Sequence, residues 1–462
     1  MKLRLTHITR SILRRAFLVC AVAGYVACFR WIYLSWLNPN FEYYGFTCHP
    51  LRPELLLAAW LLSLLPACWM PFDLHRPSQL IYWIMYLAVY VPSIWVPMLM
   101  GLRPAGQLIA LAAALGAGFA LIGLNYTLPV LKVRARKIPP KLFWIGWWAM
   151  AAALTLWVLR VFHGHIRLVS FGQVYAELRF ASDELMQGSA IRYAVMWLAG
   201  MVYPFVMAWG LVRRRWPMAL AGGLGQLLLY ATTGAKSAVV SIAVIGLLFL
   251  LLGRQGKWFG PKLVLAVIVL MAGLNMLDIR LDPDKASGLY MASSLVFMRI
   301  FGIPGLLTGF YQDFFSVHPW TYFSHVSGIN HLVRYPYGAS IGMEVGNYYY
   351  GNPDLNANTH LWGMDGLAGF GLAGILMVSL LCGLAFWLLD SVAADHDRVL
   401  AALMVSFTAL NIGNMSLFTT MLSGGLGLII VLLAVMPATG KGSRAGAVEG
   451  SHEPEPVAAA GT

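Results

Sequence analysis

The stretch SSLVFMRIFGIPGLLTGFYQDFF, residues 293–315, has the length and apolar content of a helix at membrane depth. Two features interrupt it: Arg299 places a charge in mid-run, and Gly302-Ile303-Pro304-Gly305 favours a break in the helix. Irregular backbone at membrane depth must be buried in protein or line a cavity. Residues 293–310 are therefore predicted to form a helix or re-entrant segment packed against other membrane helices.

The composition around this stretch is that of an integral membrane protein. Hydrophobic residues make up 59% of the 462 residues, charged residues make up 11%, and the mean hydropathy is +0.70. Successive apolar runs long enough to cross about 30 Å of hydrocarbon predict an all-α, polytopic fold. The predicted spans number twelve and cover residues 15–36, 54–72, 80–100, 106–129, 142–161, 190–212, 218–233, 237–253, 263–279, 366–390, 399–417 and 420–437.

Positive charge orients these spans, because Lys and Arg accumulate in short cytoplasmic loops. With both termini inside, 20 of the 32 Lys and Arg residues fall on the cytoplasmic side, 11 fall outside and Arg30 lies within the first span. The apolar run that follows the basic N-terminus lacks a small-residue cleavage site, which predicts an uncleaved signal anchor. We expect a membrane domain over residues 1–439 and a disordered cytoplasmic tail over residues 440–462.

Several classes of protein and site are disfavoured. Topology accounts for most of the net charge of +13, so nucleic acid is not an expected partner. Four of the five cysteines lie inside predicted spans and Cys48 is alone in an outer loop, which predicts no disulfide framework. The histidines at 163 and 165, and the pair at 325 and 331, lack the ligand pattern of zinc sites. We expect no metal and no cofactor.

Two long outer segments, residues 162–189 and 280–365, set one face of the protein apart. The second follows the ninth predicted span and precedes the tenth, and its Tyr, Asn, Gly and Trp content is typical of a compact loop at the membrane surface. Seven of the eleven histidines fall on the outer side, as do positive residues that run against the inside trend. A common physical reason for such outer positive charge is an anionic ligand that Arg grips with two hydrogen bonds.

Each candidate cation also has a purely structural interpretation. Arg179 can pair with Glu177 or extend to the interface, and Lys236 in the sequence TTGAKS can anchor a tight turn. Arg280 can balance the two nearby aspartates at 278 and 282. Arg299 differs, because no acidic residue lies within a turn or two of it in the helix, so a structural role without a partner is costly.

The order of four short motifs resembles the Wzy-type oligosaccharide repeat-unit polymerases, which are related to O-antigen polymerases. The motifs are VYAELRF at 174–180, the TTGAKS turn at 232–237, RIFGIPGLLTGFYQDFF at 299–315 and NANTHLWGMDGLAGFGLAGIL at 356–376. The resemblance covers roughly residues 140–435. It implies a multi-pass protein of the bacterial inner membrane that acts on undecaprenyl-diphosphate-linked oligosaccharides at the periplasmic face.

What the resemblance implies about chemistry agrees with the residue inventory. A metal-independent glycosyltransferase of this kind moves a growing glycan from its lipid diphosphate to a hydroxyl of the next unit, and Arg side chains stabilise the leaving group. A histidine or a carboxylate accepts the proton of the acceptor hydroxyl. The predicted catalytic candidates are His325, His331 and Glu344. The predicted substrate-binding residues are Arg179, Arg280, Arg299, Lys236, Tyr175 and Tyr311, and Trp320, Tyr348 and Tyr349 are further candidates for stacking on sugars.

Two other functions stay open at this point. An O-antigen ligase differs only in its acceptor, a lipid A core. A transporter or flippase of lipid-linked glycans is disfavoured, because the sequence has no internal repeat and its outer charges gather on one face. Expected partners are the lipid bilayer, the lipid-linked oligosaccharide, a flippase and a chain-length regulator.

Overall fold

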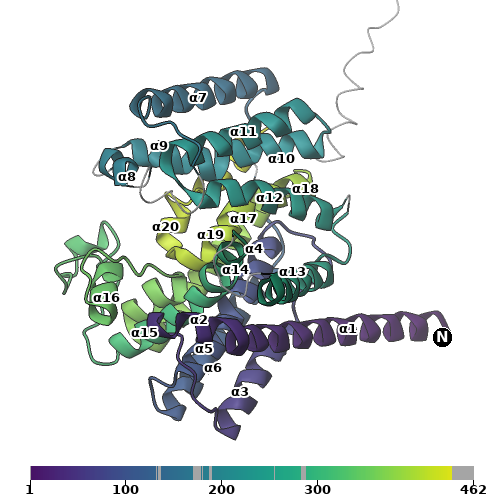
Figure 1. Ribbon diagram of the computed structural model, residues 1–462. Coiled ribbons are helices and arrows are strands. Elements are labelled where there is room, and N and C mark those ends of the chain that lie inside the picture. Colours follow the sequence, from purple (N-terminus) through teal and green to yellow (C-terminus); the bar gives the residue numbers. More distant parts are fainter. Residues whose placement is uncertain are drawn as a thin grey trace, which may run out of the picture.

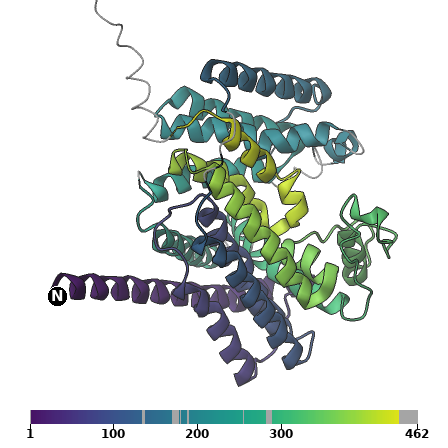
Figure 2. The same cartoon turned by 180° about the vertical axis from the view of Figure 1, so that it is seen from behind.

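The computed structural model describes residues 2–131, 133, 137–169, 178, 180–186, 190–253, 255–281 and 288–439. Every regular element within these ranges is a helix, which confirms the predicted all-α class (Figure 1). The N-terminal end of α1 (Lys2–Ile32) and the region around α16 (Ile341–Tyr350) project from opposite sides of the molecule in both views (Figures 1 and 2). The expected tail at 440–462 lies outside the described residues.

The remaining α-helices follow one another with short connections. They are α2 (Asn38–Phe41), α3 (Pro53–Leu64), α4 (Ser78–Met85), α5 (Val91–Met100), α6 (Ala105–Leu124), α7 (Pro140–Val161), α8 (Phe180–Met186), α9 (Ile191–Trp197), α10 (Tyr203–Val212), α11 (Trp216–Thr233), α12 (Lys236–Leu252), α13 (Phe259–Leu281), α14 (Gly288–Ser294), α15 (Ile303–Phe314), α17 (Ala368–Val392), α18 (Arg398–Met404), α19 (Ser406–Asn411), α20 (Leu417–Met421) and α21 (Leu426–Val435).

Wide π-helical turns interrupt several of the long helices. They occupy Tyr33–Leu37, Tyr86–Tyr90, Leu198–Val202, Leu295–Gly302 and Trp362–Leu367. In three cases a proline follows two residues after the π-helical turns end, at Pro92, Pro204 and Pro304. Proline has no N–H and its ring crowds the carbonyl four residues earlier, so a widened turn lets the helix continue through it.

The predicted break at Gly302-Ile303-Pro304-Gly305 is therefore wrong. The helix runs from Gly288 to Phe314, and at this point its π-helical geometry gives way to the α-helix α15. Gly305 has a packing role, since a Cβ there would lie 2.4 Å from the Pro92 carbonyl oxygen. The close approach of α15 to α5 thus depends on this glycine.

Nine helical segments of the described chain are long and apolar enough to cross a membrane: Ser11–Tyr44, Ser78–Met100, Ala105–Thr127, Pro140–Val161, Ile191–Val212, Phe259–Leu281, Gly288–Phe314, Trp362–Val392 and Leu417–Val435. A polytopic membrane protein is the coarse conclusion. Three expected spans correspond to shorter apolar helices, Pro53–Cys68, Lys236–Leu252 and Arg398–Asn414. One long segment, Gly288–Phe314, lies where an outer loop was expected, so the number of twelve spans and the outer placement of residues 280–365 stay predictions.

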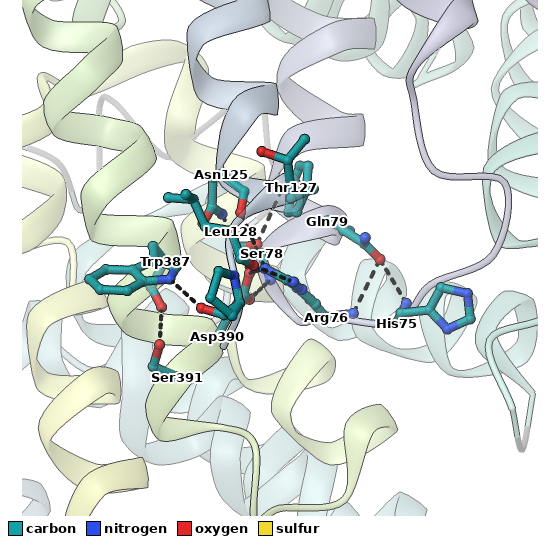
Figure 3. Close-up of polar contacts among 12 residues, drawn as sticks. His75, Arg76, Ser78, Gln79, Asn125, Thr127, Leu128, Trp387, Asp390 and Ser391 are labelled. Atoms are coloured by element: carbon teal, nitrogen blue, oxygen red, sulfur yellow. Dashed lines mark hydrogen bonds and ion pairs between the residues drawn. The ribbon is translucent and has the colours of Figure 1, made fainter. Parts of the chain in front are cut away.

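Loops expected on the cytoplasmic side meet at one end of the bundle. The buried Asp390 of α17 accepts hydrogen bonds from Ser78 N at 3.1 Å and from Ser78 Oγ at 2.7 Å (Figure 3). Its carboxylate lies 4.0 Å from the Arg76 guanidinium, which donates to the Leu128 carbonyl at 2.9 Å. Because an isolated buried carboxylate is costly, these contacts tie the ends of α17, α4 and α6 together.

Candidate active site

Lys236 and Arg299, both predicted to bind substrate, line the same pocket of about 490 Å³. Lys236 is the first residue of α12, and Arg299 lies in the π-helical turns that precede α15. We call this cavity the Arg299 pocket. Its polar lining is completed by Ser237, Ser294, Asn411 and Asn414.

The Arg299 pocket has the electrostatics of an anion site. No Asp or Glu is among the described residues that line it. Arg299 is exposed and makes no hydrogen bond or ion pair within the described part of the chain. No side chain caps the start of α12 after Ala235, so the positive end of that helix dipole also meets the pocket.

A second cavity, of about 520 Å³, lies beside the stretch of chain that follows Asn414. We call it the His325 pocket. Its walls come from the loop at 324–341, the start of α9, and residues 416–423. Asn411 and Asn414 line the Arg299 pocket, whereas Ser416 and the residues after it line the His325 pocket, so one short stretch of chain contributes to both.

His325 is held on both sides of its ring. Its Nε2 lies 3.2 Å from Asp365 Oδ1, and its Nδ1 lies 2.9 Å from Thr321 Oγ1. Asp365 is fully buried, and its second oxygen accepts from Leu417 N at 2.6 Å. With both ring nitrogens engaged, His325 has no free lone pair for the proton of a bound hydroxyl. This geometry favours a positioning role over the predicted role of catalytic base.

The loop that carries His325 is fastened to a kink in α17. The kink is at Phe370 and Gly371, and Gly371 has φ +60° and ψ −138°, which a residue with a side chain rarely adopts. The carbonyls of the preceding residues bond the loop instead: Thr321 N donates to Ala368 O at 2.8 Å, and Tyr322 N donates to Gly369 O at 3.1 Å. The Gly-Phe-Gly motif noted in the sequence therefore positions the wall of the His325 pocket.

The loop also carries backbone strain. Tyr322 and Phe323 have φ of 51° and 63°, a left-handed conformation that is unfavourable for aromatic residues. Such residues persist where the surrounding structure over-determines them. Here the hydrogen bonds to α17 on one side and the His325–Asp365 contact on the other hold the strained residues in place.

The other predicted site residues lie apart from the two pockets. His331 is exposed in a short 3₁₀ turn, and the Glu344 carboxylate accepts from Ala339 N at 2.8 Å. Tyr311 is fully buried with its hydroxyl on Ala357 O, so it offers no face to a sugar. Arg280 is exposed in the last turn of α13 and is not in the lining of the Arg299 pocket. Tyr175 and Arg179 lie outside the described residues.

The three further aromatic candidates also lie outside both pockets. Trp320 and Tyr348 are 40% and 53% exposed, which leaves part of each ring available. Tyr349 stacks on Phe310 with ring centroids 3.9 Å apart, and its hydroxyl donates to Asp313. Tyr349 is thus committed to packing.

Sequence reasoning missed several polar residues that the structure brings to these sites. Asp365 stands in the quoted stretch NANTHLWGMDGLAGFGLAGIL, and an acid at the start of a long apolar helix is a signal that was present. Asn411 and Asn414 fall at the junction of two predicted spans, where polar residues are ordinary. Only the fold shows that these amides face Lys236 and Arg299.

No protein-family model, no curated protein and no solved structure matches this chain. The fold and the sites define a polytopic helical membrane protein with a cationic pocket next to a pocket of uncharged polar groups.

Proposed function

We propose that the protein polymerises undecaprenyl-diphosphate-linked oligosaccharide repeat units at the periplasmic face of a bacterial inner membrane. The observation that carries the proposal is the pairing of Lys236 with Arg299 in one pocket. Two cations with an uncapped helix start and no described carboxylate in the lining suit a diphosphate. The resemblance in the order of the sequence motifs supplies the class of substrate.

The reaction needs charge stabilisation more than a metal. The bond between the anomeric carbon of the donor glycan and its diphosphate oxygen breaks, and a bond from that carbon to the acceptor hydroxyl oxygen forms. The acceptor proton leaves, and undecaprenyl diphosphate is released. Guanidinium and ammonium groups placed where the negative charge develops lower the barrier without reorganisation.

Proton transfer places a separate demand on the site. None of the three predicted bases, His325, His331 and Glu344, lines the Arg299 pocket. Leaving-group stabilisation by Lys236 and Arg299 is therefore the part of the mechanism that the geometry supports best. The predicted clamp is reduced to these two residues among those described, because Arg280 is not in the pocket lining.

The test is transfer by the purified protein on a lipid-linked repeat unit, with and without a chelator. A ladder of products that persists in the chelator supports the proposal. Absence of polymer, or activity that a chelator abolishes and a divalent ion restores, contradicts it. In cells, loss of the protein should leave single repeat units on the lipid core; glycan that stays entirely on undecaprenyl lipid indicates a ligase instead.

A further inference from the structure

The His325 pocket differs in chemistry from its neighbour. Among the described residues that line it there is no Asp, Glu, Lys or Arg. Its polar groups are hydroxyls and one side-chain amide, contributed by Tyr193, Ser324, Ser327, Asn330, Tyr335, Ser340, Ser416, Thr419 and Ser423. A cavity of about 520 Å³ is within the usual range for ligand sites.

The one titratable group in that lining without a hydroxyl, His325, brings no net charge to a ligand. Its Nε2 faces the buried Asp365 at 3.2 Å, so an imidazolium there is neutralised by the carboxylate. The neutral ring donates to the same carboxylate oxygen. In either protonation state the pair offers a ligand no unbalanced charge.

Several polar groups remain accessible. Ser327, Asn330, Ser340 and Thr419 are exposed on the pocket walls, whereas Ser324 is buried and its hydroxyl donates to Thr321 O. Tyr193, 46% exposed, adds an aromatic face with a hydroxyl at its edge. Hydroxyl and amide groups exchange hydrogen bonds with sugar hydroxyls, and aromatic faces cover the C–H face of a sugar ring.

We propose that the His325 pocket binds an uncharged segment of an oligosaccharide and discriminates against acidic sugars. The biological identity of this ligand rests on the proposed function, because a polymerase must hold glycan beside its diphosphate site. The shared stretch that ends the Arg299 pocket at Asn414 and begins the His325 pocket at Ser416 supplies that adjacency.

Discrimination against acidic sugars follows from what the pocket lacks. A carboxylate that enters gives up water and gains no cation among the described lining residues. The buried Asp365 behind His325 adds like charge on that side. An unpaired charge in such a site acts against the wrong ligand, and we expect oligosaccharides with one uronic acid to bind at least about tenfold more weakly than neutral ones of equal length.

Direct binding provides the test, with the full-length protein in lipid nanodiscs, because maltoside detergents carry a neutral disaccharide that competes. The probes are an array of neutral tetrasaccharides and of tetrasaccharides with one uronic acid, without lipid or phosphate. Wild-type protein should bind members of the neutral set. Ser423→Trp, which fills the His325 pocket, and Asn330→Ala, an exposed loop change, should each weaken that binding about tenfold.

Ser237→Trp is the matched control, because it places the same bulk in the Arg299 pocket and should leave binding of these lipid-free sugars intact. Size-exclusion elution reports folding, and Asn330→Ala keeps the test informative if the Trp variant aggregates. No binding to any neutral probe, equal binding of acidic probes, or full binding by folded Ser423→Trp and Asn330→Ala would overturn the pocket assignment. Sugar binding without transfer activity would instead overturn the polymerase and leave the pocket standing.

Discussion

Lys236 and Arg299 come from different helices, yet their side chains share one cavity with no described carboxylate. A cation in such a place is unfavourable unless a ligand or solvent balances it. Arg presents a planar fork that matches two phosphate oxygens, whereas Lys acts as a point charge. The two side chains are thus complementary parts of an anion site.

Shared contact with one ligand predicts coupling between the two cations. Lys236→Ala and Arg299→Ala should each weaken binding of inorganic pyrophosphate about tenfold, and the double variant should depart from additivity by roughly 0.5–3 kcal/mol. Calorimetric titration of the four proteins measures the cycle, and Arg280→Ala serves as a control with unchanged affinity. Strict additivity would mean that the two side chains do not contact the same anion.

Prediction at the residue scale succeeded where local sequence carried the reason. Arg299 was singled out because no acid lies near it in the helix, and the structure gives it no described partner. Tyr311 looked like any aromatic of an outer loop, but its environment is set by tertiary packing, which buries it completely. Asp365 was overlooked because its partner, His325, is 40 residues away in sequence.

At the scale of elements, the kink in α17 is the device that positions the loop of the His325 pocket. We expect Gly371→Ala to destabilise the protein by about 1–3 kcal/mol, because its backbone conformation is strained for any residue with a Cβ. Thermal unfolding in nanodiscs measures the effect. Gly106→Ala in α6, where a Cβ meets nothing within 4 Å, is the control and should change little. Equal melting temperatures for Gly371→Ala and wild type would show that the kink is not required.

Element prediction was limited by two physical effects. Apolar runs reveal buried helices, but they do not separate a membrane span from a shorter packed helix, as Pro53–Cys68 and Arg398–Asn414 illustrate. Proline and glycine in one motif suggested a break, whereas widening of the turns before Pro304 keeps the helix continuous. The sequence rule that prolines follow the π-helical turns emerges only from the comparison of three such sites.

At the scale of the whole molecule, topology determines which pockets an outer glycan can reach. In a cysteine-free background, a single cysteine at His331 should react with an impermeant thiol reagent added outside intact cells, and one at Asp395 should not. Both positions are exposed in the structure, so membrane sidedness decides the result. Labelling at 395 with protection at 331 would invert the predicted orientation.

The end of the bundle opposite the two pockets contains a pH-sensitive contact. Burial lowers the pKa of His396 below its usual 6.5, Lys137 lowers it further, and the Leu433 carbonyl and Asp395 act in the opposite direction. Its Nε2 donates to Leu433 O at 2.8 Å, which fits the neutral ring. The contribution of this neutral histidine to stability is therefore complete above about pH 6.5 and declines as the pH falls, because the unfolded chain then takes up a proton that the folded chain resists.

We expect the melting temperature of the wild type to fall more between pH 7 and pH 5 than that of His396→Gln. The glutamine variant keeps a donor for Leu433 but has no proton to take up. Differential scanning fluorimetry of the two proteins over that interval gives the comparison. Parallel pH profiles would show that His396 does not contribute to acid sensitivity.

The most direct test of the anion site is glycan ladder length in cells that express Arg299 variants, normalised to the amount of protein in the membrane. Arg299→Lys should lose most polymerisation because a single ammonium does not replace the planar fork, and Arg299→Ala should lose about a hundredfold to a thousandfold in rate. Arg280→Ala, outside the pocket lining, should give near-normal ladders. Near-normal ladders from well-expressed Arg299→Ala, or equal loss of protein and product, would show that Arg299 anchors the helix and holds no diphosphate.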